Sequence, residues 1–378
     1  MPGCRAPRCE GPVTHASRRG IAAIVAMAWV SCGGVPEARA WDLATGVAAT
    51  YDDNILNYSE RDLFAFRYRL NPARYGLETT DDLILSQYLE LGLDSESSRS
   101  SSFLARFATN HYLSNRIRNN LDCQLQGRVW PSPRWRVTLA ASYLPSYYAR
   151  RYVDNSVSVP YPQLSRYRDA RYGQAGASGG AEWRPIRAWR AQLGYDYRRR
   201  NFQRGFSERD EDRHTLRLSL RPPRRFGIGS RWRGSYGRTL ARGRDELESG
   251  GTGSVPDVST RSLGGGLVLE WTARSREPSI TLQQAVDYER RRYTTADTSD
   301  TQRFGRSIRE LDLDWDVAVG FAGHWQASAG YGLVTQRLSG SLSNVETFTD
   351  AGSYNRNRMS LRLSWASREH TTHSGETE

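Results

Sequence analysis

The sequence predicts an all-β fold, a transmembrane antiparallel up-and-down β-barrel of about 14 strands, and three observations carry this prediction. First, apolar residues recur at every second position. In 309–321, Leu311, Leu313 and Val317 alternate with acidic residues, a spacing that a helix of 3.6 residues per turn would scatter. Second, short and long connections alternate along the chain. Third, tryptophans gather at one set of strand ends and tyrosines at the other.

The overall composition does not by itself indicate a membrane protein. The chain has 378 residues, a formal net charge of +12, 38% hydrophobic residues and a mean hydropathy of -0.68. A barrel strand carries its apolar residues at alternate positions, so no run of about 20 apolar residues is required. The chain holds no lysine, so all 53 basic residues are arginines. After residue 40 the only cysteine is Cys123, which excludes an internal disulfide in the mature chain.

The N-terminus is typical of a secretory signal peptide. Arg18 precedes an apolar run at 21–30, and Ala40 ends a small-residue cleavage site. An alternative is a lipoprotein acylated at Cys32. The predicted organisation is a signal peptide at 1–40, an outer-membrane β-barrel at 41–365 and a polar C-terminal tail at 366–378.

The first barrel strand is predicted at 41–51, where Trp41, Leu43 and Val47 share one parity. It begins directly at the predicted cleavage site. The acidic and amide residues at 52–54 favour a turn and end the strand.

Residues 52–81 are ambiguous. Phe64 and Phe66 alternate as in a strand, whereas Ser59 followed by acidic residues up to Asp62 resembles a helix N-cap and first turn. A strand here would make the total odd, but a single-chain bacterial barrel has an even number of strands. We therefore predict one long outer loop with a helical turn.

The two-residue alternation continues to the end of the barrel. Further strands are predicted at 82–93, 102–112, 119–130, 135–148, 170–183, 188–198, 213–221, 226–240, 260–272, 279–290, 307–321, 325–337 and 356–365. Alternation is weakest in 170–183. The last strand ends in Trp365 and resembles the C-terminal aromatic signal that the barrel assembly machinery reads.

The connections between strands set the orientation. Short turns are predicted at 131–134, 184–187, 222–225, 273–278 and 322–324, and long loops at 149–169, 199–212, 241–259, 293–306 and 338–354. Outer-membrane barrels place short turns in the periplasm and long loops outside. One short connection, 113–118, falls on the outer side.

The aromatic residues agree with this orientation and predict two girdles. Tryptophans at the predicted periplasmic ends are Trp41, Trp130, Trp135, Trp183, Trp189, Trp271, Trp325 and Trp365. Tyrosines at the outer ends are Tyr51, Tyr112, Tyr147, Tyr148, Tyr197, Tyr288, Tyr331 and Tyr354. A general preference of aromatic residues for strands explains their presence but not this sorting.

The strand faces opposite the apolar parity carry many charges, which must meet water or each other because an arginine in lipid costs about 2–4 kcal/mol. The predicted acidic row is Glu310, Asp312, Asp314 and Asp316. The predicted basic wall is Arg213, Arg217, Arg221, Arg231 and Arg233. We expect a transverse field across a water-filled lumen, acidic on one wall and basic on the other. The alternative is a salt-bridge lattice that fills the barrel and conducts nothing.

Arginines also gather near the outer strand ends. The predicted outer-rim phosphate contacts are Arg150, Arg151, Arg199, Arg200, Arg290, Arg291 and Arg292. Guanidinium groups bind phosphate bidentately, and lipopolysaccharide presents dense phosphates in the outer leaflet. We expect these side chains to anchor the barrel there; the alternative is that they are solvated loop arginines.

The sequence shows no motif of an enzyme, a cofactor site or a metal site. It lacks a Gly-x-Ser-x-Gly elbow, a phosphate loop and a cysteine pair. His111, His214 and His324 fall on separate elements, and His370 and His373 lie in the polar tail without further ligands. We therefore predict that the chain is not an enzyme, holds no cofactor and binds no nucleic acid.

The turn at 51–56, Tyr-Asp-Asp-Asn-Ile-Leu, followed by strand pairs over 41–365, resembles bacterial outer-membrane β-barrels of the porin-like type, including barrels associated with exopolysaccharide-export operons. The resemblance implies location in the cell outer membrane of a Gram-negative-type (diderm) bacterium. It also implies membrane lipids, lipopolysaccharide, the barrel assembly machinery and export-complex proteins as partners.

Two functions are consistent with these observations. The first is a porin-like channel for hydrophilic or charged solutes, because fourteen strands enclose a wider lumen than the eight that side chains fill. The second is a non-conducting scaffold or accessory component of envelope assembly or exopolysaccharide export.

Overall fold

The computed structural model describes residues 39–95, 101–153, 167–186, 188–203, 206, 209–242, 259–273, 278–294, 305–321, 324–340 and 353–367. The strands are β1 (Arg39–Asp52), β2 (Asp82–Ser95), β3 (Ser101–Tyr112), β4 (Asn120–Ser132), β5 (Trp135–Val153), β6 (Tyr167–Trp183), β7 (Arg190–Phe202), β8 (Glu211–Arg221), β9 (Ile228–Ala241), β10 (Thr260–Ala273), β11 (Ser279–Tyr293), β12 (Ser307–Phe321), β13 (Trp325–Ser339) and β14 (Tyr354–Ala366). The predicted signal peptide up to residue 38 and the predicted tail from residue 368 lie outside the described residues.

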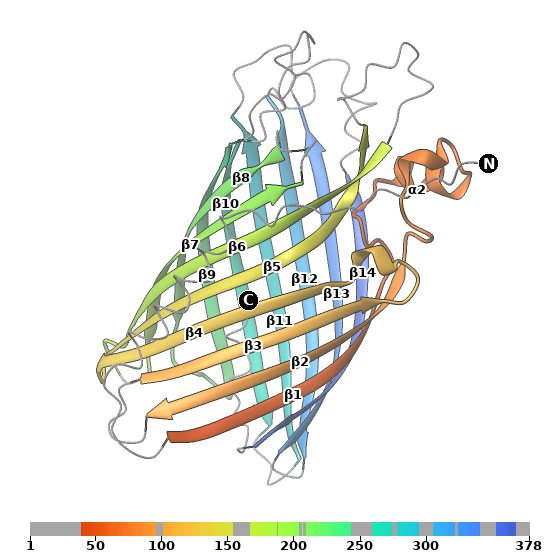
Figure 1. Ribbon diagram of the computed structural model, residues 1–378. Coiled ribbons are helices and arrows are strands. Elements are labelled where there is room, and N and C mark those ends of the chain that lie inside the picture. The colour runs from red at the N-terminus through yellow and green to blue at the C-terminus, as the bar shows by residue number, and fades with distance from the viewer. Residues whose placement is uncertain are drawn as a thin grey trace, which may run out of the picture. The chain divides into compact units, whose positions relative to one another are not determined.

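The sheet closes on itself. Each strand pairs antiparallel with its sequence neighbours, and β1 pairs with β14, so that Val47 lies opposite Leu363 (Figure 1). The predicted all-β fold with fourteen antiparallel strands in up-and-down order is confirmed. Every predicted strand overlaps an observed one, and the largest difference is at the end of β5, which reaches Val153.

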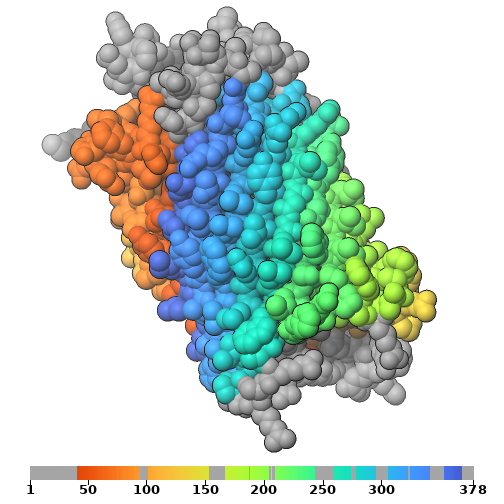
Figure 2. Space-filling view, turned by 180° about the vertical axis from the view of Figure 1, so that it is seen from behind, coloured from red at the N-terminus to blue at the C-terminus, as the bar shows by residue number. Residues whose placement is uncertain are grey.

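Residue parity separates the two faces of the wall. On β12, Leu311 and Val317 are exposed on the outer surface, whereas Asp312, of opposite parity, lines an internal cavity. Among the apolar side chains that are more than half exposed are Leu193, Leu218, Trp232, Leu263, Met359 and Leu361. All of these except Leu193 of β7 belong to strands β8–β14, the part of the wall that is seen in Figure 2. An apolar exterior of this extent is suited to hydrocarbon rather than water.

Polar residues at the end of β1 fasten the seam between the first and last strands. Asp52 is 1% exposed and forms an ion pair with Arg356 of β14. Asn357 donates its backbone N–H to Asp53 Oδ1 at 2.7 Å and its side-chain amide to Asp53 Oδ2 at 2.6 Å. The sequence predicted Asp52 and Asp53 only as turn formers, because their partners lie 304 residues further along the chain.

Residues 53–81, here called the rim segment, lie outside the ladder, as predicted. Helix α2 (Glu60–Arg67) begins after Ser59, whose hydroxyl accepts a hydrogen bond from the backbone N–H of Asp62 at 3.1 Å. The 3-10 helix η1 (Pro72–Arg74) follows. In Figure 1, α2 lies on the outer side of the barrel rim. The prediction of a loop outside the ladder that contains a helical turn is therefore confirmed.

The rim segment bridges the wall between β14 and β5. At one side the Asn54 side-chain amide donates to the carbonyl oxygen of Asn355 at 3.2 Å. At the other side Arg150 donates to the carbonyl oxygen of Leu56 at 3.1 Å. A buried cluster holds the segment in place: Ile55, Leu56, Tyr58, Tyr75, Leu77, Tyr112 and Tyr148. The rim segment is therefore a packed part of the barrel.

Four tyrosines assigned to the outer girdle lie inside the protein instead, and one of them is Tyr354 at the start of β14, which is 6% exposed. Tyr148 and Tyr112 are buried in the cluster under the rim segment, and the ring of Tyr147 packs against Tyr172 at 5.3 Å. For Tyr147 and Tyr148 the reason is local: the β5 register shifts twice near them, so simple alternation no longer predicts the facing side. Tyr112 of β3 has the parity opposite to the exposed Phe107, and alternation alone places it inside. Burial also raises the pKa of Tyr58, which keeps its hydroxyl protonated. Other predicted girdle members are exposed: Tyr51, Tyr288 and Tyr331.

Candidate functional site: the charged lumen

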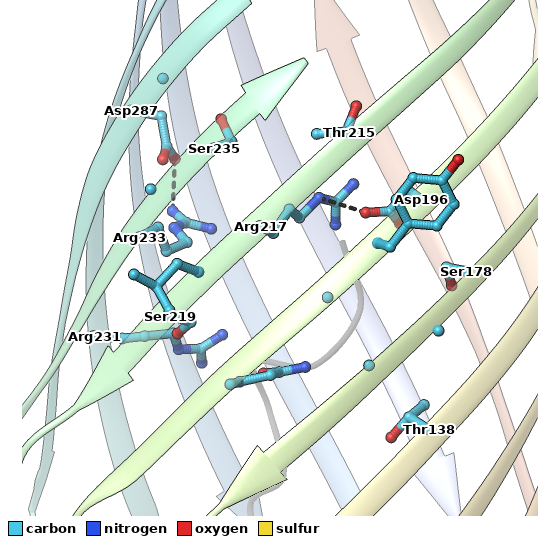
Figure 3. Close-up of a pocket in the computed structure, with 18 of the residues that line it drawn as sticks. Thr138, Ser178, Asp196, Thr215, Arg217, Ser219, Arg231, Arg233, Ser235 and Asp287 are labelled. Atoms are coloured by element: carbon cyan, nitrogen blue, oxygen red, sulfur yellow. Dashed lines mark hydrogen bonds and ion pairs between the residues drawn. The ribbon is translucent and has the colours of Figure 1, made fainter. Parts of the chain in front are cut away.

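A cavity of about 740 Å³ lies inside the barrel and is lined from nine consecutive strands, β4 to β12. Its lining is polar, with amide, hydroxyl, carboxylate and guanidinium groups. Figure 3 shows Thr138, Ser178, Thr215, Ser219 and Ser235 facing this space together with arginines and aspartates. The cavity is large enough for a small hydrophilic solute.

The predicted acidic row lies on the lumen parity of β12. Glu310 and Asp312 line the cavity, and Asp314 and Asp316 continue the row along the strand. The register places Asp312 opposite Asp287 of β11, and Glu310 opposite Glu289. The acidic sector is therefore two strands wide, which the sequence did not show.

Arginines from both sides partly neutralise this sector. Arg358 of β14 lies 3.5 Å from Asp312 and 3.3 Å from Asp314, and it reaches them across the intervening strand β13. Gly332 makes this approach possible, because a Cβ there would lie 2.6 Å from the Asp314 carboxylate and 3.2 Å from Arg358. On the other side Arg291 of β11 is 2.6 Å from Glu310.

The predicted basic wall occupies the lumen face of β8 and β9. Its five members are Arg213, Arg217, Arg221, Arg231 and Arg233. Three of their ion pairs are Arg217 with Asp196 at 3.0 Å, Arg213 with Glu289 at 3.0 Å, and Arg233 with Asp287 at 2.6 Å. Figure 3 shows the Arg217 and Arg233 pairs as dashed lines. A fourth pair joins Arg221 to Glu270 at 3.5 Å.

The acidic and basic walls are closer together than the sequence predicted. Only β10 separates β9 from β11, and the Arg233–Asp287 pair crosses it at Gly266, where a Cβ would overlap the Asp287 carboxylate. The two walls are therefore neighbouring sectors joined by ion pairs. Sequence reasoning missed this because it did not consider which residues of β10 lack a side chain.

The outer-rim arginines divide into three groups. Arg150 and Arg151 bind the rim segment, through the carbonyl oxygens of Leu56 and Tyr75 respectively. Arg199 pairs with Asp212 at 3.1 Å, and Arg200 with Glu211 at 2.8 Å. The remaining three lie on β11: Arg290, Arg291 and Arg292.

Parity decides the environment of these last three. Arg291 lies on the lumen face with Glu289 and Glu310, contrary to the outward position expected for it. Arg200 also differs from the expectation, because it lies on the lumen face of β7. Arg290 and Arg292 point to the opposite side, and they form no ion pair with another residue of the described chain. The alternation already visible in the sequence was the signal that distinguishes them.

Within the described ranges no group of three or more His, Cys, Asp or Glu side chains is arranged to hold a metal ion. No helix in that part of the chain is long and apolar enough to cross a membrane.

The solved structures to which the chain is similar include three outer-membrane proteins. A bacterial polysaccharide outer membrane secretin has 10% identity and a TM-score of 0.48, with 86% of this chain and 98% of that chain covered. The outer membrane channel DcaP of Acinetobacter baumannii has 8% identity and a TM-score of 0.41, with 88% and 99% covered. An anion-selective porin from Comamonas acidovorans has 8% identity and a TM-score of 0.38, with 87% and 99% covered.

No protein-family model matches the chain, and a search of curated proteins finds no significant relative. The similarities to solved structures are too distant to assign a function. The fold class follows from the closed ladder and the apolar exterior. The chain is a β-barrel of the outer-membrane type.

Proposed function

We propose that this barrel is a porin-like channel for hydrophilic or charged solutes. The observation that carries the proposal is the polar cavity of about 740 Å³ inside a closed wall of fourteen strands. Such a wall encloses more space than the interior of an eight-stranded barrel, which side chains fill. The carboxylates and guanidinium groups on its inner face require water or ionic partners, and a wet lumen supplies the water.

The competing interpretation is that the ion pairs fill the lumen and block it. The pairs named above run along the wall instead: Arg217 with Asp196 joins neighbouring strands, and Arg213 with Glu289 joins strands three apart. Pairs of this kind line the inner surface of the barrel. This geometry favours an open space beside them, where the cavity lies.

A planar-bilayer recording of the refolded barrel tests the proposal. We expect discrete conductance steps from protein whose folded state is verified by its heat-modifiable mobility on a denaturing gel. Folded protein that gives no conductance over a range of voltages and salts contradicts a channel.

A scaffold role in envelope assembly or exopolysaccharide export is the second candidate, and the rim segment favours it. The segment exposes Phe64, Tyr68 and Leu70, by 56%, 60% and 52%, on a rigidly packed base. Such a surface suits a protein of the export complex. Site-specific photo-crosslinking from Tyr68 in cells tests this role: a discrete protein adduct supports it, and lipid adducts alone contradict it.

We propose lipopolysaccharide as the lipid partner, but with a different set of contact residues from the seven arginines predicted from the sequence. Arg290 and Arg292 keep this role because both point away from the lumen. The rim segment adds exposed Arg67 beside Phe64 and Tyr68, whose rings lie 4.4 Å apart. Aromatic rings together with guanidinium groups suit the phosphate-bearing interface of the outer leaflet.

A further inference from the structure

The lumen face of β7 and β8 brings arginines directly opposite one another. The register pairs Arg198 with Arg213 and Arg190 with Arg221. Like charges at directly opposite positions of a sheet repel each other and destabilise it. The sheet therefore keeps a local excess of positive charge at this place. Acidic side chains form ion pairs with some of these arginines but not with all of them.

Two of these four arginines, Arg190 and Arg198, form no ion pair within the described ranges, and of the two only Arg198 lines the cavity. Arg213 pairs with Glu289, and Arg217 pairs with Asp196. Arg198 forms no ion pair with any other residue in the described ranges, and its side chain is exposed on the lumen face. Its guanidinium has five N–H donors and no acceptor, so these donors are available to an anion.

The wall beside Arg198 leaves room for a ligand. Its partner on β6 is Gly176, where a Cβ would lie 2.6 Å from the Ser142 hydroxyl and 3.7 Å from Arg198 Cγ. No side chain covers the guanidinium from that position. Arg198 also lines the cavity of about 740 Å³, together with the hydroxyl-bearing Ser178 and Thr215.

We propose that Arg198, flanked by Arg213 and Arg217, is an anion-binding station for small solutes that carry a phosphate or carboxylate group. The planar guanidinium binds either group bidentately, and the neighbouring positive charges add attraction. Hydroxyl groups of Ser178 and Thr215 are placed to meet the polar remainder of such a solute. The physiological role of the station rests on the proposed channel, but its binding chemistry does not.

Isothermal titration calorimetry of the refolded barrel in detergent, with inorganic phosphate and with acetate as probes, tests the station. We expect saturable binding that weakens about tenfold in Arg198→Gln, because the bidentate contact is lost. The matched control is Arg362→Gln, which removes the same charge from the lumen face of β14, outside the cavity lining. It should bind as the parent does.

A second variant, with lysine at the same position, keeps the proposal testable if Arg198→Gln does not fold. Arg198→Lys keeps the charge and loses the planar fork, so we expect an intermediate affinity, about threefold weaker than the parent. Absence of saturable binding in the parent overturns the proposal. An equal loss in Arg198→Gln and Arg362→Gln also overturns it, because net charge alone then accounts for the effect.

Bilayer recordings separate this proposal from the channel itself. Arg198-dependent binding by a barrel that does not conduct supports the station and contradicts the channel. A conducting barrel whose phosphate binding is independent of Arg198 supports the channel and overturns the station.

Discussion

Single glycines decide which charges meet inside this barrel. Gly266 lies between Arg233 and Asp287, and Gly332 lies between Arg358 and Asp314. Both ion pairs cross a strand at a glycine, which has no side chain to stand between the two charges. The charge lattice therefore depends on residues that carry no charge.

Gly266→Ala tests this dependence. The new Cβ would overlap the Asp287 carboxylate and lie 2.9 Å from the carbonyl oxygen of Val286, and a backbone oxygen cannot rotate away. We expect the free energy of unfolding to fall by about 1–3 kcal/mol, as for overpacked sites. The measurement is the urea midpoint of the refolded barrel, followed by tryptophan fluorescence.

The matched control is Gly234→Ala on the neighbouring strand β9. A Cβ at Gly234 meets no atom within 4 Å, so we expect the midpoint to stay where it is or to rise slightly. Similar losses in the two variants would show that strand glycines are needed for backbone reasons and not for the crossing ion pair.

At the scale of elements, β1 and β14 illustrate how the ladder is closed. Their backbone register is supported by the Asp52–Arg356 pair and by the contacts of Asn357 with Asp53. These contacts lie at the end of β1 where the rim segment begins. The seam and the rim segment are therefore fixed by the same polar group of residues.

Asp52→Ala should weaken the seam. It removes a carboxylate that is 1% exposed and leaves the partly buried Arg356 without its partner, at a cost of about 3 kcal/mol in the free energy of unfolding. Chemical denaturation monitored by heat-modifiable gel mobility measures it. Asp314→Ala is the comparison, because its side chain is 44% exposed and its loss should cost less than about 1 kcal/mol. Equal costs would mean that the seam pair has no special role.

The rim segment gives a second prediction at this scale. Replacing Phe64 and Tyr68 with serine removes two exposed aromatic rings without touching the buried cluster. We expect about tenfold weaker association with lipopolysaccharide in a co-purification assay, because each ring loses burial in the lipid interface.

The control for this pair is Glu78→Gln, an exposed position in the same segment. It should leave lipopolysaccharide association unchanged. Unchanged association in the double serine variant, with the barrel folded, would remove α2 from the proposed lipid contacts.

For the whole molecule, the distribution of charge around the lumen determines the field that a solute meets. The acidic sector on β11 and β12 and the basic sector on β7 to β9 are joined by ion pairs at their common border. The field is therefore strongest along that border and falls off around the wall. Such a field orients dipolar solutes and biases the flow of ions.

Neutralising the acidic row should shift the ion preference of the channel. Changing Asp312, Asp314 and Asp316 to asparagine removes three negative charges and leaves Arg358 without its two acidic partners. We expect the reversal potential in a salt gradient to move toward anion preference. Each single substitution should act in the same direction.

The comparison for each single change is Asp169→Asn, which removes one charge from the outer rim, where Asp169 pairs with Arg151. It should not move the reversal potential. Unchanged selectivity in the triple variant would show that the row does not face the conducting path.

The sequence by itself determined the strands, their number and the two faces of each one. These are local properties: a two-residue period fixes which side chains share a face, and Ser59 with its acidic followers fixes the start of α2. The same period already indicated that Arg291 faces the opposite side of the sheet from Arg290 and Arg292. Where the period is interrupted, as near Tyr147 and Tyr148 in β5, local reasoning failed.

Only the tertiary structure decided which charges pair. Asp52 meets Arg356 across 304 residues, and Arg233 meets Asp287 across a strand that happens to have a glycine between them. Such partners depend on the register of strands far apart in the chain and on the side chains that are missing between them. A periodic pattern within one strand carries no information about either. The charged faces could therefore be predicted from the sequence, but the ion pairs between them could not, and neither could the exposed Arg198 that these pairs leave without a partner.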